Sequence, residues 1–393
     1  MKRILALLLT LVMMVGLVAA CGGSDEPAET DAPEEAAEPA DDSAEEEPAD
    51  EEPADEEPAA GGEASDLNVG VFYYDFADSY ISTVRSELDK MLEEAGITYT
   101  NYDAAGSQPT QTEAVNSAIT GGTNLLVVNI VETAAIDAAQ GIVDSAKEAG
   151  IPVIFFNREI DNSVIDSYEL AAFVGTDAPE AGHMQGQMIG EFLLENYDDV
   201  DLNGDGKISY IMLKGQEGNP EAEARTQYSV EDANAILTDA GKEELVYYDE
   251  NAASKFLVDP DGAWSSAAGQ EYMQTALATY TEDSNNMIEI VIGNNDDMAL
   301  GALSALQAAG YNKEGGTYIP VFGVDATETA VGKIDSGEMT GSIKQDNVGM
   351  ASTLMTLINN VANGDEIMAN TDDYNVDADV DKIRVPYSIV TGQ

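Results

Sequence analysis

The chain has 393 residues, of which 75 are Asp or Glu and 16 are Lys or Arg, so its formal net charge at pH 7 is −59. A charge this negative argues against nucleic acid and against an anionic membrane surface as partners, because both would repel it. The chain has one cysteine, which excludes any disulfide within it.

The first twenty residues have the pattern of an export signal. Lys2 and Arg3 precede an apolar run from Ile4 to about Ala20, which is too short for a membrane span. The run ends in Leu-Val-Ala-Ala followed by Cys21, which resembles the lipobox of bacterial lipoproteins. That resemblance implies a signal peptide at 1–20 and an acylated Cys21 that holds the chain on the outer face of the cytoplasmic membrane. An ordinary signal peptide followed by a chance cysteine is the alternative.

The segment 21–66 is expected to be a tether behind this anchor. After Cys21 it is rich in Asp and Glu, lacks Lys and Arg, and repeats motifs such as EEPAD. With almost nothing to bury and strong self-repulsion, it should be disordered and extended. From Leu67 onwards the composition becomes globular, and the length suits two domains.

The globular part alternates runs of strand and helix character. Strands are expected at 69–74, 97–102, 125–129, 151–156, 172–175, 208–213, 245–248, 288–292, 321–324, 341–344 and 383–390. Helices are expected at 79–95, 108–120, 133–149, 178–195, 221–240, 265–280 and 348–362, with two more that begin near 298 and 327. Strands separated by helices of this length predict an α/β fold with mostly parallel sheets flanked by helices on both faces.

The stretch Ile288–Gly301 shows where a ligand is expected. Its apolar strand is followed by four short polar residues that include Asn295, and then by an apolar helical pattern. Open α/β sheets place their ligands at such a strand end and helix N-terminus. Glu289 is a carboxylate in the expected apolar strand, so it should be exposed, paired with a cation or bound to a metal.

Polar and aromatic side chains occur at several other strand ends and helix starts. Carboxylates, amides and a guanidinium each bond adjacent hydroxyls, and aromatic rings cover apolar C–H faces, so together they suit a neutral polyhydroxylated ligand. Taken singly, such residues are also common helix caps and turn residues. The candidates are Asp78, Tyr80, Asn129, Arg225, Trp264, Asn295 and Asp325.

A family resemblance rests on segments spread in order over about Leu67–Val390. They include VGVFYYDFADSYIS, IPVIFFNRE, VGTDAPEAG, DLNGDGKI, LKGQEGNPEAEAR, IEIVIGNNDDMALGAL, IPVFGVDA and RVPY. The body resembles the galactose/glucose-binding proteins of bacterial ABC transport, within the two-lobed type I periplasmic-binding family. The resemblance implies two lobes joined by three hinge crossings. The expected lobes are 67–156 with 347–382, and 157–346 with 383–393.

The same resemblance places the sugar contacts of the family on the seven candidates above. Three further positions line up with contacts but differ from the family in residue type: Asn219 stands for a His, Glu221 for an Asp and Gln345 for an Asn. Changed donors around a buried ligand change which isomer is accepted, because unpaired buried polar groups are penalised. The resemblance therefore implies a glucose- or galactose-like monosaccharide and leaves the choice of sugar open.

The segment Asp201–Ser209 has the alternating oxygen ligands and central glycine of a calcium loop. The twelfth position of an EF-hand would be Met212, so the loop is not an EF-hand. In the family a distant Glu completes the site, and the matching residue is Glu289. The expected calcium ligands are Asp201, Asn203, Asp205, the carbonyl of Lys207, Ser209 and Glu289. A plain Asp/Gly turn is the alternative.

Several classes of enzyme are disfavoured by what the chain lacks. His183 is the only histidine, and Cys21 is the only cysteine, so the common Ser–His and Cys–His nucleophiles are absent. No G-x-G-x-x-G follows the first expected strand, which disfavours a dinucleotide-dependent dehydrogenase. A carboxylate pair for glycoside hydrolysis stays open in so acidic a chain, although we expect no enzyme.

We predict a monomeric lipoprotein that captures a monosaccharide between its lobes and delivers it to an ABC permease. A sugar sensor for a chemoreceptor or kinase is one alternative, and a calcium-stabilised surface protein without a transport role is another. A repressor of the same fold is excluded by the export signal and by the lack of a basic DNA-binding segment.

Overall fold

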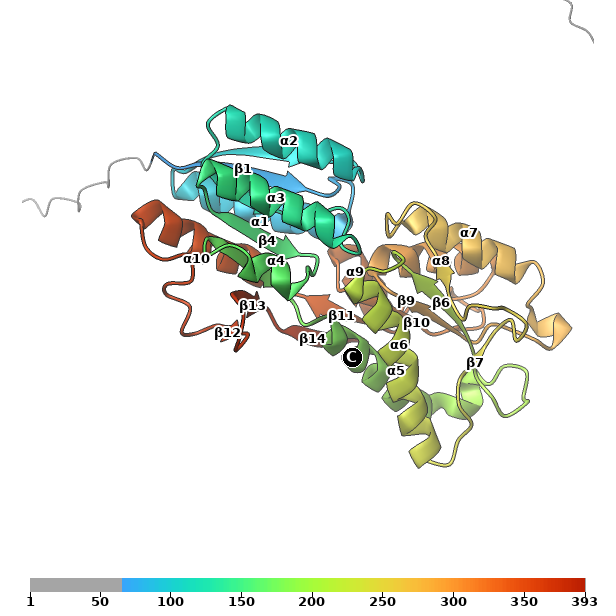
Figure 1. The fold of residues 1–393 in the computed structure, drawn as a ribbon. Coiled ribbons are helices and arrows are strands. Elements are labelled where there is room, and N and C mark those ends of the chain that lie inside the picture. The colour runs from blue at the N-terminus through green and yellow to red at the C-terminus, as the bar shows by residue number, and fades with distance from the viewer. Residues whose placement is uncertain (1–65, 393) are drawn as a thin grey trace, which may run out of the picture. The chain divides into compact units, whose positions relative to one another are not determined.

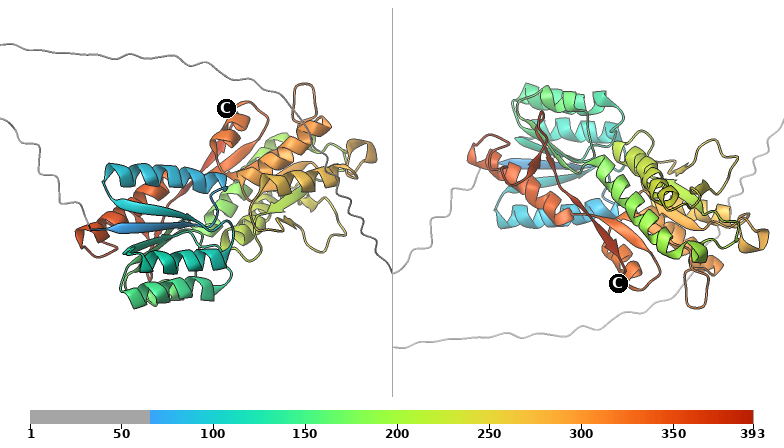
Figure 2. Two further views of the ribbon diagram at one scale, coloured as in Figure 1. Left: turned by 90° about the horizontal axis from the view of Figure 1, so that it is seen from above. Right: turned by 90° about the horizontal axis from the view of Figure 1, so that it is seen from below.

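The computed structural model describes residues 66–392, and these belong to one compact unit. The predicted signal peptide, Cys21 and nearly all of the predicted tether lie outside the described residues. Two seven-stranded sheets organise the described residues, with helices on both faces of each sheet (Figures 1 and 2). This arrangement confirms the predicted two-lobed fold. Within 66–392, no helix combines the length and the apolar character needed to cross a membrane.

The sheet of the first lobe has the strand order β12-β13-β5-β4-β3-β1-β2, and all pairs except β12–β13 are parallel. Alternate residues of β1 face opposite sides: Val69 and Val71 pack with α1 and α10, whereas Phe72 packs with α2 and α3. The strands are β1 (Asn68–Tyr73), β2 (Thr98–Asp103), β3 (Leu125–Val128), β4 (Val153–Asn157), β5 (Ala171–Gly175), β12 (Asn375–Val376) and β13 (Lys382–Arg384). The helices are α1 (Ser79–Glu94), α2 (Gln108–Thr120), α3 (Ile136–Ala149), α4 (Asn162–Asp166) and α10 (Asn347–Asn363).

The sheet of the second lobe has the order β14-β11-β10-β9-β6-β7, with β8 also paired to β6 and only β14 antiparallel. One face packs against α5 and α6, and the other against α7, α8 and α9. The strands are β6 (Ser209–Lys214), β7 (Val246–Tyr247), β8 (Leu257–Val258), β9 (Ile290–Gly293), β10 (Val321–Asp325), β11 (Gly341–Gln345) and β14 (Tyr387–Thr391). The helices are α5 (Ala178–Val200), α6 (Pro220–Asp239), α7 (Ser266–Leu277), α8 (Asp296–Ala309) and α9 (Glu328–Asp335), with a 3-10 turn at Glu282–Ser284.

The chain crosses between the two sheets at three places. The crossings run from β5 to α5, from β11 to α10 and from β13 to β14. The predicted number of crossings agrees with the structure, but two predicted lobe boundaries do not. We expected the first lobe to end at 156, yet β5 pairs in parallel with β4, so the first crossing follows Gly175. We also expected one strand at 383–390, which the structure divides between β13 in the first sheet and β14 in the second.

Candidate functional site

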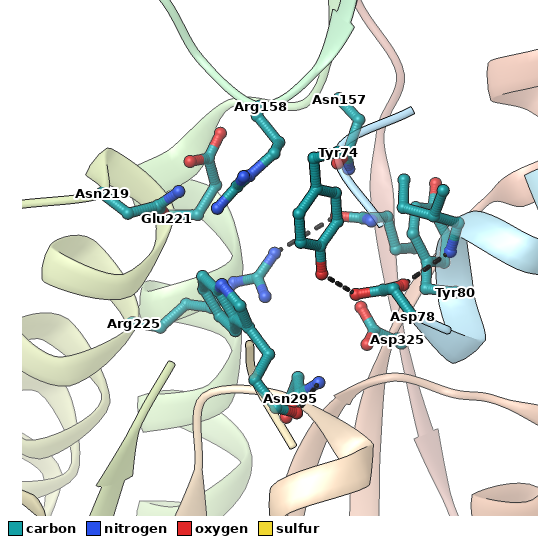
Figure 3. Close-up of a pocket in the computed structure, with 13 residues that line it drawn as sticks. Tyr74, Asp78, Tyr80, Asn157, Arg158, Asn219, Glu221, Arg225, Asn295 and Asp325 are labelled. Carbon is teal, nitrogen blue, oxygen red and sulfur yellow. Dashed lines mark hydrogen bonds between the residues drawn. The ribbon is translucent and has the colours of Figure 1, made fainter. Parts of the chain in front are cut away.

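A pocket lies between the lobes, where the carboxyl ends of the strands face one another. It encloses about 380 Å³ of space free of protein atoms, with its open mouth included. Figure 3 shows side chains from both lobes converging on it. The first lobe contributes Tyr74, Asp78, Tyr80, Ile81, Asn157 and Arg158, and the second contributes Asn219, Glu221, Arg225, Trp264, Asn295, Asp325 and Gln345.

Three helices begin at the wall of this pocket, each with a pocket residue as its N-cap. The Asp78 carboxylate accepts the backbone N–H of Ile81 at 2.7 Å at the start of α1. Asn219 and Asn295 cap α6 and α8 in the same way, at 3.0 and 3.1 Å. The positive ends of the three helix dipoles therefore point towards the pocket and favour hydrogen-bond acceptors there. These three residues can therefore cap their helices and still contact a ligand in the pocket.

Asp325 is a buried carboxylate at the end of β10 for which the described residues provide no hydrogen bond or salt bridge. Its φ of 118° lies in the region that favours glycine, so the backbone is held there at some cost. Burial raises the pKa of Asp325 well above its ordinary value, and the charge of Arg225 opposes this rise. An unpaired, strained carboxylate in a pocket wall indicates a group that bonds a ligand.

Arg225 is held rigidly by the second lobe. Its Nη1 donates to the carbonyl of Asn294 at 2.9 Å, and its Nη2 donates to Gln345 Oε1 at 3.2 Å and to the hydroxyl of Tyr387 at 3.0 Å. Its Nε is buried and finds no partner among the described residues. Three of its five N–H donors are used in these bonds, and the Nε–H is among those left for a ligand. The guanidinium carbon Cζ lies 5.6 Å from the ring centroid of Trp264, which also lines the pocket.

Glu221 contributes a second buried carboxylate to the wall. Its Oε1 accepts the backbone N–H of Glu159 at 2.8 Å, whereas its Oε2 is buried without a partner among the described residues. Burial and the nearby charge of Glu159 raise the pKa of Glu221. Oε2 is a second free acceptor for a ligand hydroxyl.

The sequence interpretation did not single out Arg158. Its guanidinium lies 4.1 Å from the ring centroid of Tyr74, and its Nη1 donates to the carbonyls of Ile130 and Val131 at 3.0 and 2.8 Å. Its Nη2 crosses the cleft and donates to Gln216 Oε1 at 2.5 Å. Tyr74, also missed, donates its hydroxyl to the Asp78 carboxylate. Tyr74 directly follows β1 and Arg158 directly follows β4. The same placement at the end of a strand that pointed to Asn295 could therefore have pointed to both.

The pocket brings together nine of the ten predicted sugar contacts, and Asn129 is the exception. Asn129 is fully buried behind the wall, and its Nδ2 donates to the carbonyl of Phe156 at 3.1 Å and to Asn157 Oδ1 at 3.2 Å. Its Oδ1 accepts the backbone N–H of Tyr74 at 3.4 Å. In this structure Asn129 therefore supports two lining residues, Tyr74 and Asn157.

Comparison with known proteins connects this pocket to a family. The model of the periplasmic binding protein domain matches residues 69–366. The chain belongs to the periplasmic binding protein family. Members of this family bind a substrate rather than transform it, so the prediction that the chain is not an enzyme is confirmed.

Individual relatives of this periplasmic binding protein agree with that membership. It is 35% identical, over 77% of its length and 83% of the relative, to the D-galactose/methyl-galactoside binding periplasmic protein of Haemophilus influenzae. A solute binding protein of Clostridium phytofermentans with bound β-D-glucose has the same fold, with a TM-score of 0.64, 24% identity and coverage of 82% and 94% of the two chains. A solute binding protein of Bacillus halodurans with bound myo-inositol also has this fold, with a TM-score of 0.63 and 22% identity. The match covers 84% of this chain and 96% of that one. The family resemblance seen in the sequence is confirmed.

The predicted calcium ligands of this binding protein also gather in one place. Glu289, just before β9, accepts the backbone N–H groups of Leu202 at 2.9 Å and Asn203 at 3.4 Å through Oε1, and that of Ser209 at 2.7 Å through Oε2. Burial raises the pKa of Glu289 to about 7. The Ser209 hydroxyl instead donates to the carbonyl of Met287.

The side chains of the loop itself close a compact turn. Asp201 accepts the backbone N–H groups of Asp205 and Gly206 at 3.1 and 2.8 Å, and Asn203 accepts that of Asp205 at 2.9 Å. Asp205 accepts the N–H of Lys207 at 2.9 Å. In the described part of the chain, no three His, Cys, Asp or Glu side chains are placed to hold a metal by themselves. The donors of the loop are nevertheless all oxygens, which is the ligand type that calcium requires.

Proposed function

We propose that this periplasmic binding protein captures a neutral monosaccharide, glucose- or galactose-like, between its lobes and delivers it to an ABC permease. The observation that carries the proposal is the set of unpaired polar groups in the pocket wall. Asp325, Glu221 Oε2 and Arg225 Nε are buried at the same cavity without partners among the described residues. Ligand hydroxyls would pair them, which removes the penalty of leaving them buried.

The charges of the pocket favour an uncharged ligand. Three carboxyl groups, on Asp78, Glu221 and Asp325, lie with two guanidinium groups, on Arg158 and Arg225. These signs nearly cancel, so neither an anion nor a cation gains a strong net attraction. Carboxylates and guanidinium groups both bond pairs of neighbouring hydroxyls, as a pyranose presents them.

The relatives support both the ligand class and the transport role. Their names mention D-galactose, β-D-glucose and myo-inositol, which are all uncharged and polyhydroxylated. Two of them are solute binding proteins of ABC transporters, which favours transport over the sensor alternative.

A thermal-shift panel tests the proposed ligand class. The panel contains D-galactose, D-glucose, D-xylose and myo-inositol, with glucose 6-phosphate and glutamate as charged controls. We expect at least one neutral compound to raise the melting temperature, since a ligand that binds only the folded state stabilises it by mass action. Stabilisation by the charged controls alone, or by none of the compounds, would contradict the proposal.

We further propose a structural calcium ion at the loop Asp201–Ser209. The support is the all-oxygen donor set and the buried carboxylate of Glu289, for which the described residues provide no cationic partner. The ion would be held by Asp201, Asn203, Asp205, Glu289 and the Lys207 carbonyl, and it would join the loop to β9. The hydroxyl of Ser209 points elsewhere, so its share in the ligand set would be small.

We also propose that the protein is a monomer anchored through lipid on Cys21. The support is the lipobox-like ending Leu-Val-Ala-Ala before Cys21 and the family membership, which agrees with an extracytoplasmic location. Stable anchoring requires two or more acyl chains, since one chain alone binds a membrane only marginally.

A further inference from the structure

The hydroxyl of Tyr387 lies at a point where all three crossings between the lobes meet. Tyr387 is the first residue of β14, directly after the third crossing. Its hydroxyl lies 2.7 Å from the Thr176 hydroxyl, which directly follows β5 at the first crossing. It also lies 3.0 Å from Oε1 of Gln345, the last residue of β11 before the second crossing. The third contact of the hydroxyl, at 3.0 Å, is with Nη2 of Arg225 in the pocket wall.

The chemistry of the partners fixes the direction of each hydrogen bond. A guanidinium only donates, so Arg225 donates to the Tyr387 oxygen. The Gln345 oxygen only accepts, so it receives the single proton of the Tyr387 hydroxyl. The Thr176 hydroxyl must then donate to Tyr387, whose two acceptor sites and one proton are all used. We call Tyr387, Thr176, Gln345 and Arg225, joined by these bonds, the node. In this arrangement the Tyr387 hydroxyl uses its proton and both of its acceptor sites.

The site is buried, so water does not readily replace a lost bond. Tyr387 is 5% exposed, Gln345 3%, Arg225 4% and Thr176 0%. The tyrosine ring packs in the core of the second lobe with residues such as Met188 and Ile343. Removing the hydroxyl alone would therefore keep the packing and leave the Thr176 donor and one Arg225 donor without their shared acceptor.

We propose that Tyr387 is a positioning residue that couples the ligand contact of Arg225 to the three hinge crossings. This inference deepens the proposed function and rests on it for the ligand. A ligand that holds Arg225 in place also holds the node, and the node holds the three segments about which the lobes rotate. Hinge segments that are fixed relative to one another favour one lobe arrangement over others.

A second link, through Arg384, joins the first and third crossings independently of Tyr387. Arg384, just before the third crossing, donates through Nη1 to the carbonyl of Thr176 at 2.8 Å and to the Glu159 carboxylate at 2.5 Å. The first and third crossings therefore stay joined when the Tyr387 hydroxyl is removed. The second and third crossings are also joined through the backbone, because Gln345 pairs with Tyr387 in the β11–β14 ladder. The node adds the side-chain link that ties all three crossings together, so its loss should loosen them rather than separate them.

Hydrogen exchange on the sugar-free, full-length protein tests the hinge part of the inference. Tyr387→Phe should speed amide exchange in peptides that cover Thr176–Asp177, Gln345–Asp346 and Val385–Tyr387. The matched control is Tyr73→Phe, since the Tyr73 hydroxyl is also buried but has no hydrogen-bond partner in the described residues. Faster exchange confined to β14 would show a local structural role and overturn the inference. If Tyr387→Phe fails to fold, Thr176→Val removes one donor at the same node and should give faster exchange at the first and second crossings.

Calorimetry with D-galactose and D-glucose tests the coupling to the ligand. Tyr387→Phe should weaken the affinity about tenfold or more, because a buried bond to a charged group is lost, while Tyr73→Phe should leave it unchanged. Unchanged affinity in Tyr387→Phe would overturn the coupling. If the wild-type protein binds neither sugar yet all three crossings exchange faster in Tyr387→Phe, the proposed ligand is wrong and the hinge role stands.

Discussion

A hydrogen bond between the two lobes gives a quantitative test of lobe closure. Ser79, in the first turn of α1, lies with its Oγ 2.9 and 2.7 Å from Oδ1 and Oδ2 of Asp297, in the first turn of α8. The two residues belong to different lobes and are both half-buried. Because this bond forms only when the lobes are together, its free energy adds to the stability of the closed state and hence to ligand affinity.

The size of the effect follows from the exposure of the pair. A hydrogen bond to a charged group contributes about 1.5–3 kcal/mol when well buried. Partial exposure of Ser79 and Asp297 reduces this to about 1 kcal/mol by our estimate, or about a fivefold loss of affinity in Asp297→Ala. Calorimetric titration with the best monosaccharide of the panel measures the loss.

A double-mutant cycle separates this bond from indirect effects. Ser79→Ala should weaken binding by a similar factor, and the double variant should be little weaker than either single variant. Ser145→Ala is the matched control, since the Ser145 hydroxyl bonds Asn116 at 3.1 Å within the first lobe. Fully additive losses, or an equal loss in Ser145→Ala, would refute the closure argument.

Four further predictions concern the pocket, its pH dependence, the loop and the anchor. Asp78→Ala, Asn295→Ala and Asp325→Ala should each weaken sugar affinity by about 1–3 kcal/mol in calorimetry, and retained affinity in all three would remove the site. Burial raises the pKa of Asp325 in the free pocket, and hydroxyl donors from a ligand lower it again. Binding should therefore release protons, and affinity should rise as the pH rises towards the raised pKa. Calorimetric titrations over a range of pH, in buffers of different ionisation enthalpy, measure this, and proton uptake would contradict it. Calcium at 100 times its dissociation constant should stabilise the folded state by about 2.7 kcal/mol, and Glu289→Gln should largely remove this gain. Identical melting curves with calcium and with chelator would mean that the loop is an ordinary turn. Cys21→Ser should release the protein from the membrane fraction or block processing, and an unchanged fraction and size would contradict lipidation.

Local sequence signals predicted the elements and part of the pocket. Asn295 follows a buried strand and begins a helix, so its place at the pocket wall follows from adjacent residues alone. Asp78 and Asn219 are similar, because a short polar side chain before an apolar helical pattern predicts an N-cap. Such signals need no knowledge of the rest of the chain.

The features that sequence reasoning misplaced depend on contacts between distant segments. β5 is a short apolar run that suits either sheet, and only its pairing with β4 and β13 assigns it to the first lobe. Arg158 is oriented by the carbonyls of Ile130 and Val131 and by Gln216 of the other lobe, none of which is near it in sequence. Asn129 directly follows β3, but its amide turns to Asn157 rather than to the cavity.

A crystal structure of the protein with the best-binding monosaccharide tests the central claim most directly. We expect one sugar in the pocket between the lobes, with hydroxyls within hydrogen-bond distance of Asp325, Arg225 and Glu221. We also expect Ser79 and Asp297 to be in contact across the cleft. A sugar bound elsewhere, or one in the pocket that leaves these three groups unpaired, would contradict it.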